Sequence, residues 1–258
     1  ITAVALLMFT PKQDRKPGAG RLLKDELRPL KQMRVWRFSL YYVAVFGAYV
    51  ALAAWLPKYY VDNFGVTLST AALLTATYIF PASLLRPLGG WFSDKIGARK
   101  VMYWTFAVMI ASTFLLMMPN GHLVVNVSES VSATGVKEVL PYELGLVPFA
   151  ILVFILGCAM GIGKAAVYKH IPEYFPGQVG SVGGLVGMFG GLGGFALPPL
   201  FAYTTAWTGL PSATFFVLFV LSVVCAIWMH LTVVSMLHKE SPELSDHFET
   251  PPSKENAS

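Results

Sequence analysis

Residues 212–238 read SATFFVLFVLSVVCAIWMHLTVVSMLH, a stretch without a single Asp, Glu, Lys or Arg. A helix of about 20 such residues spans the roughly 30 Å of hydrocarbon in a bilayer. Lipid offers the backbone no hydrogen-bond partner, and a helix satisfies its own N–H and C=O groups. The stretch also lacks the strict alternation of a membrane barrel strand. It therefore predicts a transmembrane helix.

Five more apolar runs of similar length precede this one. They cover residues 38–57, 68–92, 101–119, 144–168 and 181–203. Hydrophobic residues make up 55% of the chain and charged residues 13%, whereas soluble domains carry about 25% charge. Too little charge remains to cover a water-facing surface. The sequence predicts an all-α membrane protein with six transmembrane helices.

Basic residues gather on one side of these predicted spans. The stretch from Lys12 to Arg37 holds nine Lys or Arg against three acids. The other loops on that side are residues 93–100, with three more bases, and the loop containing Lys169 and His170. The positive-inside rule then places both ends of the chain in the cytoplasm. Because much of the net charge of +5 lies in the stretch from Lys12 to Arg37, it does not indicate a nucleic-acid partner.

The chain divides into four predicted segments. They are the end of a preceding transmembrane helix at 1–10, a basic cytoplasmic linker at 11–37, a six-helix half at 38–238 and a polar cytoplasmic tail at 239–258. The first run is too short to span, and it lacks the charged start and cleavage site of a signal peptide. The pattern is typical of a transporter built from two six-helix halves, and we expect this chain to be the second half.

Arg86 lies inside an otherwise apolar span. A central arginine costs about 2.5–3.5 kcal/mol on insertion scales. It could extend to the cytoplasmic interface, but helical side chains lean toward their own N-terminus, which here points deeper into the membrane. A guanidinium can bind a planar oxyanion through two parallel hydrogen bonds. Pro81 and Pro87 each remove a backbone donor, so we expect a kink nearby.

Residues 180–194 read GSVGGLVGMFGGLGG. Glycines spaced by three and four residues share a helix face and allow close helix packing. That packing needs only two or three of them. The excess favours a helix that shifts against its neighbours and exposes its backbone to a small ligand, with Gly187, Gly190 and Gly191 as candidate contacts.

Residues 90–100 read GWFSDKIGARK and connect two predicted spans on the basic side. The simpler interpretation is a charged loop that sets topology. Alternatively, Asp94 could face the positive N-terminus of a neighbouring helix, and the bases could pair across the loop. Contacts of Asp94, Lys95, Gly97 and Arg99 would then form a gate, in which Asp94 with Arg99 latches the cytoplasmic side.

Lys164 lies near the cytoplasmic end of its span. A lysine there commonly extends to the headgroups. A buried lysine can also lose its proton, which makes Lys164 a candidate coupling residue, with Tyr168 on the same face. No Asp or Glu lies inside the six predicted spans. A proton carrier would therefore be Lys164, His170 or a group of the other half, unless the transporter exchanges one anion for another.

These motifs together resemble the nitrate/nitrite porter (NarK-like) family of the major facilitator superfamily. Residues 90–100 resemble the superfamily's loop signature, although Ala98 replaces a common base, and residues 180–198 resemble the family's nitrate signature. The resemblance implies that Arg86 and Tyr42 contact the substrate. It also implies a second arginine and a second glycine-rich helix, both from the other half. The stretch around Lys164 is similar to the branch that takes up nitrate with protons.

The function implied is secondary active transport of nitrate or nitrite across the inner membrane by alternating access. Proton-linked nitrate uptake is favoured, and nitrate/nitrite exchange or transport of another organic or inorganic anion stays open. The expected partners are the anion, the other half, the lipid bilayer and protons. The sequence shows no nucleophile–base pair, phosphate loop or metal-ligand spacing, so we expect no enzyme activity, no cofactor and no metal.

Overall fold

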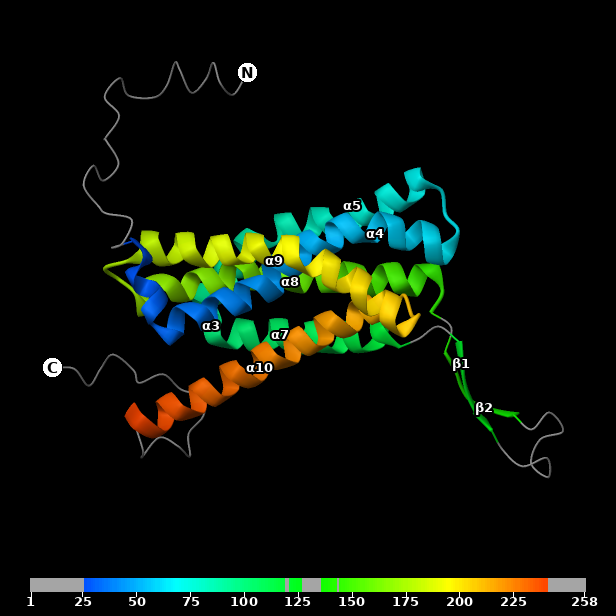
Figure 1. The fold of residues 1–258 in the computed structure, drawn as a ribbon. Coiled ribbons are helices and arrows are strands. Elements are labelled where there is room, and N and C mark those ends of the chain that lie inside the picture. The colour runs from blue at the N-terminus through cyan, green and yellow to red at the C-terminus, as the bar shows by residue number, and fades with distance from the viewer. Residues whose placement is uncertain (1–25, 119–120, 127–135, 143, 241–258) are drawn as a thin grey trace, which may run out of the picture.

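The computed structural model describes residues 26–118, 121–126, 136–142 and 144–240. The helix end predicted at 1–10, most of the linker and nearly all of the tail lie outside the described residues. Within them, five helices are long and apolar enough to cross a membrane, and a bent pair supplies a sixth span. The spans run side by side as a bundle of alternating direction (Figure 1). The predicted all-α membrane fold is confirmed.

The first two spans are each built from more than one helix. The first, Met33–Phe64, follows a 3-10 turn and joins two α-helices through one π-helical turn. The second bends by 41° between its two helices. The elements are η1 (Arg28–Lys31), α3 (Met33–Tyr42), η2 (Val43–Gly47), α4 (Ala48–Phe64), α5 (Leu68–Leu84), α6 (Arg86–Ile96), α7 (Ala98–Met117), α8 (Leu146–Tyr174), α9 (Val179–Thr208) and α10 (Ala213–Glu240).

Several helices extend beyond their predicted spans. The first span begins at Met33, inside the predicted linker, and α4 continues through Pro57 to Phe64. A proline within a helix removes one hydrogen bond, and here Gly65, at φ 63°, ends the helix instead. Likewise, α8 continues through Pro172 to Tyr174. Lys169 and His170 therefore lie on a helix, not in the predicted loop.

A two-stranded hairpin follows α7, where the sequence predicted only a loop. Strands β1 (Gly121–Asn126) and β2 (Val136–Tyr142) pair antiparallel, with an irregularity between Leu123 and Val124. The hairpin projects from the end of the bundle opposite to the α8–α9 connection (Figure 1). A connection that appears irregular in sequence can still pair its backbone, because strand pairing needs only aligned N–H and C=O groups.

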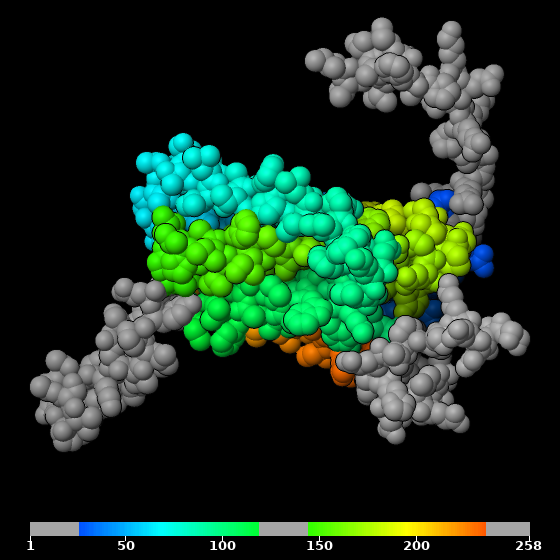
Figure 2. Space-filling model, turned by 180° about the vertical axis from the view of Figure 1, so that it is seen from behind, coloured from blue at the N-terminus to red at the C-terminus, as the bar shows by residue number. Residues whose placement is uncertain are grey.

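Helix α8 packs closely against α5 and α6 through glycines. A Cβ atom added at Gly157 would lie 2.8 Å from the Tyr78 carbonyl oxygen, and one at Gly161 would lie 2.6 Å from that of Ala82. Gly89 of α6 is similarly close to the Ile162 backbone, at 2.5 Å. Figure 2 shows the face of the bundle to which α5, α6 and α8 contribute. Such contacts hold the bend between α5 and α6 against α8.

A second glycine contact joins α9 to the π-helical turn η2. A Cβ at Gly47 would lie 2.9 Å from the Gly190 carbonyl oxygen and 3.1 Å from the Gly193 Cα. Single π-helical turns inside α-helices occur frequently at functional sites. Here the turn directly follows Tyr42, so it places that side chain against the glycine-rich stretch of α9.

Candidate functional site

Arg86 is the first residue of α6, directly after the break at Leu85. Pro87 cannot donate to the carbonyl of Ser83, which explains why the break falls here and agrees with the expected kink. The side chain is exposed in this chain. Its guanidinium carbon lies 5.7 Å from the centre of the Tyr168 ring, so the arginine lies beside α8 and does not extend away from the bundle.

Tyr42 forms an aromatic wall next to Arg86. Its ring stacks on Phe46 at 5.0 Å and meets Tyr168 edge-on at 4.9 Å. Its hydroxyl interacts electrostatically with both Arg86 and Tyr168. The structure therefore brings together Arg86 and Tyr42, the two side chains expected to contact the substrate.

Tyr168 contacts both Arg86 and Tyr42, whereas its sequence position marked it only as a neighbour of Lys164. Its hydroxyl donates to the carbonyl oxygen of Gly183 at 3.1 Å, and a Cβ at Gly187 would lie 2.8 Å from that hydroxyl. The phenol thus links α8 to the glycine-rich α9. Its place four residues after Lys164, one helical turn along, was the available signal.

The three candidate glycines of α9 lie in different environments. Gly190 is buried, and an added Cβ would overlap the Tyr42 ring. Gly187 is half-buried beside Tyr168, whereas Gly191 is exposed, with open space where a Cβ would be. Gly190 is therefore needed for close packing, and Gly191 offers bare backbone on the open face of the helix.

Lys164 is buried, with 3% of its surface exposed. Its Nζ atom donates to the carbonyl oxygen of Ala82 at 3.4 Å and lies 3.1 Å from the centre of the Tyr49 ring. The Tyr49 hydroxyl in turn lies 3.1 Å from Ser83 Oγ. The ammonium group therefore faces the end of α5 just before the break and does not extend to the headgroups. The positive charge of Arg86 acts electrostatically on Lys164.

Two cations and two tyrosines thus surround the break between α5 and α6. Arg86 and Lys164 supply positive charge, and Tyr42 and Tyr168 supply hydroxyl groups and ring faces. Positive donors fixed in a partly dry site attract an anion strongly, because a low dielectric strengthens the interaction. Among the described residues, no group of three or more His, Cys, Asp or Glu could hold a metal ion.

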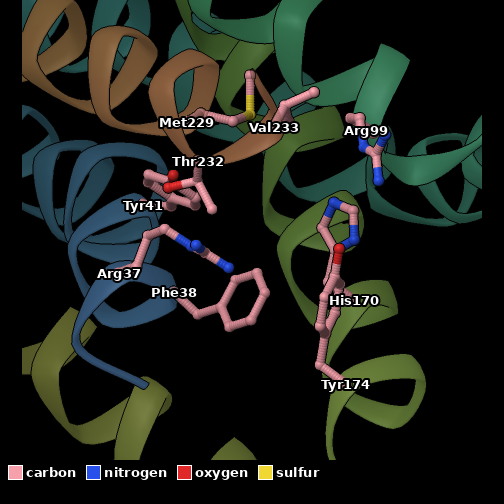
Figure 3. Close-up of a pocket in the computed structure, with 9 residues that line it drawn as sticks. All are labelled: Arg37, Phe38, Tyr41, Arg99, His170, Tyr174, Met229, Thr232 and Val233. Atoms are coloured by element: carbon pink, nitrogen blue, oxygen red, sulfur yellow. The ribbon is translucent and has the colours of Figure 1, made fainter. Parts of the chain in front are cut away.

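At the basic end of the bundle, Asp94 forms an ion pair with Lys169 of α8. From the sequence, Arg99 was the expected partner of Asp94. Lys169 is the partner here because α8 continues past Tyr168 and brings Lys169 over the end of α6, and a latch between Asp94 and Arg99 stays a prediction. Lys95 lies over the Trp91 ring at 4.1 Å, and Gly97, at φ 90°, makes the turn into α7. Arg99 lines a separate pocket with Arg37 and His170 (Figure 3).

Comparison with known proteins places the chain in a family. Residues 1–119 and 37–255 match the family model of the Major Facilitator Superfamily. The chain is 61% identical over 240 residues to a probable nitrate/nitrite antiporter, NarK1, of Thermus thermophilus, covering 93% of this chain and 53% of that protein.

More distant relatives carry related names. A nitrite extrusion protein of Bacillus subtilis is 30% identical over 93% of this chain and 55% of its own length. A probable nitrate transporter, NarT, of Staphylococcus epidermidis is 30% identical over 89% of this chain and 53% of its own length. The chain therefore spans about half the length of the relatives it matches.

Proposed function

We propose, from the premise that this chain belongs to the nitrate/nitrite porters of the Major Facilitator Superfamily, that it forms the second six-helix half of a nitrate or nitrite transporter. The complete protein would work by alternating access in the inner membrane, with both ends of this chain in the cytoplasm. Arg86 and an arginine of the other half would hold the anion between the halves, beside Tyr42 and the backbone around Gly187, Gly190 and Gly191.

The position of Arg86 is the observation that carries this proposal. A guanidinium at a helix break, next to two tyrosines and a buried lysine, has donors to offer and no described carboxylate in an ion pair with it. Nitrate and nitrite are flat anions with adjacent oxygens, which suit the paired donors of arginine. The names of the relatives agree with such a cargo.

Apolar side chains on two helices support a second half. Phe80 and Leu84 of α5 are 67% and 58% exposed, and Met188 and Phe195 of α9 are 49% and 81% exposed. Exposed apolar surface of this kind needs lipid or another protein surface to cover it. Since the relatives are about twice as long, we propose that another helical half covers part of it.

Arginine variants of the complete transporter test the proposal. Arg86→Ala and Arg86→Lys should both abolish nitrate uptake into cells while membrane insertion stays normal, because lysine cannot form two parallel hydrogen bonds. Lys58→Ala, which removes an exposed cation of α4 outside the proposed site, is the matched control. Full transport by the lysine variant would argue against paired hydrogen bonding, and full transport by the alanine variant against the site itself.

A transporter of larger organic anions within the same superfamily is the main rival. Its path would be wider than one lined by glycines that contact Tyr42 and Tyr168 directly. Competition experiments separate the two. Chlorate should compete with labelled nitrate, and sugar phosphates should not.

We further propose that Lys164 couples transport to protons. Its ammonium group is buried, contacts a carbonyl and a ring, and lies near Arg86. Binding of an anion there would favour the charged lysine, and release of the anion would favour the neutral one. The alternative is nitrate/nitrite exchange without protons, which the name of the Thermus relative favours.

Lys164→Gln separates these mechanisms. With proton coupling, the variant should lose accumulation driven by a pH gradient and keep nitrate counterflow in proteoliposomes. Lys100→Gln, at an exposed position in the first turn of α7, should change neither. If wild-type protein shows counterflow but no response to a pH gradient, exchange is the mechanism. If Lys164→Gln keeps the pH-driven accumulation of the wild type, the coupling role is wrong.

A further inference from the structure

A second basic pocket lies at the end of the bundle, between helices α3, α7, α8 and α10 (Figure 3). It is separate from the break between α5 and α6, and it contains neither Arg86, Tyr42 nor Lys164. Its lining combines cations and hydroxyl groups with a short apolar wall. The lining residues are Arg37, Phe38, Tyr41, Arg99, His170, Tyr174, Met229, Thr232 and Val233.

Three polar side chains in this pocket are buried, and two of them carry an atom without a hydrogen-bond partner. Tyr41 is 2% exposed, and its hydroxyl has no hydrogen-bond partner among the described residues. His170 is 8% exposed, and its Nδ1 atom likewise has none. Arg37 is 9% exposed. Buried polar groups are nearly always hydrogen-bonded, so such a cluster calls for a partner.

The charges of the pocket all have one sign. Among the described residues that line it, none is Asp or Glu. Glu173 of α8, which does not line the pocket, places its Oε2 atom 3.7 Å from His170 Nδ1, within ion-pair distance of a protonated imidazole but too far for a hydrogen bond. Arg37 lies 5.2 Å from the Phe38 ring centre, and His170 is under the electrostatic influence of both Arg37 and Arg99. A buried arginine near other cations is costly unless a negative group compensates it.

We propose that this pocket binds a small oxyanion group of the phosphate class. Its volume of about 30 Å³ exceeds the roughly 10–15 Å³ that one water needs. Arg37 and Arg99 supply charge-assisted donors from opposite sides, and the Tyr41 hydroxyl supplies a third donor (Figure 3). Arg99 is exposed, so the oxyanion can enter from that side.

Two sources share this chemistry, a lipid headgroup phosphate and a free inorganic oxyanion. Basic pockets between transmembrane helices on the cytoplasmic side bind anionic lipid headgroups, and Met229 and Val233 would then lie against the apolar part of the lipid. A free oxyanion would use the donors alone. Binding of either one in this pocket does not require that the protein transports nitrate.

Thermal melting of the purified complete protein tests whether the pocket binds an oxyanion. All measurements use a protein that carries Arg86→Gln, so that the proposed transport site contributes nothing to the signal. Inorganic phosphate and phosphatidylglycerol are added separately, each against chloride at matched ionic strength, and dissociation constants are taken from the shifts. We expect at least one of the two to raise the melting temperature.

The variants decide whether the shift arises in this pocket. A hydrogen bond to a charged group typically changes affinity by about tenfold or more. Arg37→Gln, Arg99→Gln and the mild Tyr41→Phe should each weaken binding to that extent, and Lys31→Gln, an exposed cation outside the pocket, should not. A phosphate effect alone identifies a free oxyanion, and a phosphatidylglycerol effect alone identifies a headgroup. The proposal is overturned if neither raises the melting temperature beyond chloride, or if the shift survives all three pocket variants.

Discussion

At the scale of single residues, Gly190 and Gly191 are neighbours with opposite surroundings. A Cβ at Gly190 would overlap the Tyr42 ring and lie 3.1 Å from Phe46, whereas a Cβ at Gly191 meets nothing within 4 Å. Overpacking costs about 1–3 kcal/mol, and alanine is favoured over glycine in a helix by about 1 kcal/mol. Gly190→Ala should therefore lower the melting temperature in detergent, and Gly191→Ala should leave it unchanged or raise it.

Transport by the same two variants tests the role of the exposed backbone. If Gly191 faces the anion or the other half, Gly191→Ala should reduce nitrate uptake although it does not lower stability. Gly190→Ala should reduce both together. Normal uptake by Gly191→Ala would remove Gly191 from the proposed substrate contacts and leave it as a lipid-facing or free surface position.

The sequence supplied candidate residues for the site, but it did not predict how their side chains meet. Arg86 was recognisable because a charge inside an apolar span is costly, and Tyr42 was indicated only by resemblance. For Lys164 the sequence allowed extension to the headgroups, and the structure instead buries it against Ala82 and Tyr49. The choice depends on which helix lies opposite, and that is information carried by packing between distant segments.

At the scale of elements, the ends of α6 and α8 are joined by the ion pair between Asp94 and Lys169, which are 57% and 44% exposed. An exposed pair contributes only about 0–1 kcal/mol to stability. If it acts as a gate contact, Asp94→Lys or Lys169→Asp should slow nitrate uptake with little change in melting temperature, and the double exchange should restore uptake.

A similar pair at the other end of the bundle serves as the control. Lys58 and Asp62 of α4 are 2.7 Å apart and also exposed, so reversal of their charges should leave uptake unchanged. If the single variants of Asp94 and Lys169 transport at the wild-type rate, the pair has no gating role. If the double exchange fails to recover the loss, Asp94 or Lys169 acts through another partner.

Element boundaries show where sequence patterns are least informative. The bend between α5 and α6 followed from Pro81 and Pro87, since each removes a backbone donor. For the first span, the predicted end at Pro57 was too early. A proline removes only one hydrogen bond, and the neighbouring turns can preserve the helix. The π-helical turn at Val43–Gly47 had no signal of its own. It arises where Gly47 packs against α9.

At the scale of the whole molecule, the alternation of basic and non-basic connections predicts orientation. Figure 1 shows the α8–α9 connection and the beginning of α3 at one end of the bundle, and the β1–β2 hairpin at the other. The first end carries Lys31, Lys95 and Lys169, and Lys58 at the second end is paired with Asp62. Since retention of basic loops on the cytoplasmic side sets topology, we expect the hairpin to lie outside the cytoplasm.

Labelling of single cysteines measures this orientation. In a background with Cys158→Ala and Cys225→Ala, a membrane-impermeant maleimide should label Lys58→Cys in intact cells. It should label Lys95→Cys only after permeabilisation, because both positions are exposed but at opposite ends of the bundle. Labelling of Lys95→Cys in intact cells would show that the orientation in the membrane is the reverse of the one expected. The Asp94–Lys169 pair and the pocket of Arg37 would then face away from the cytoplasm, and neither could act as proposed on that side.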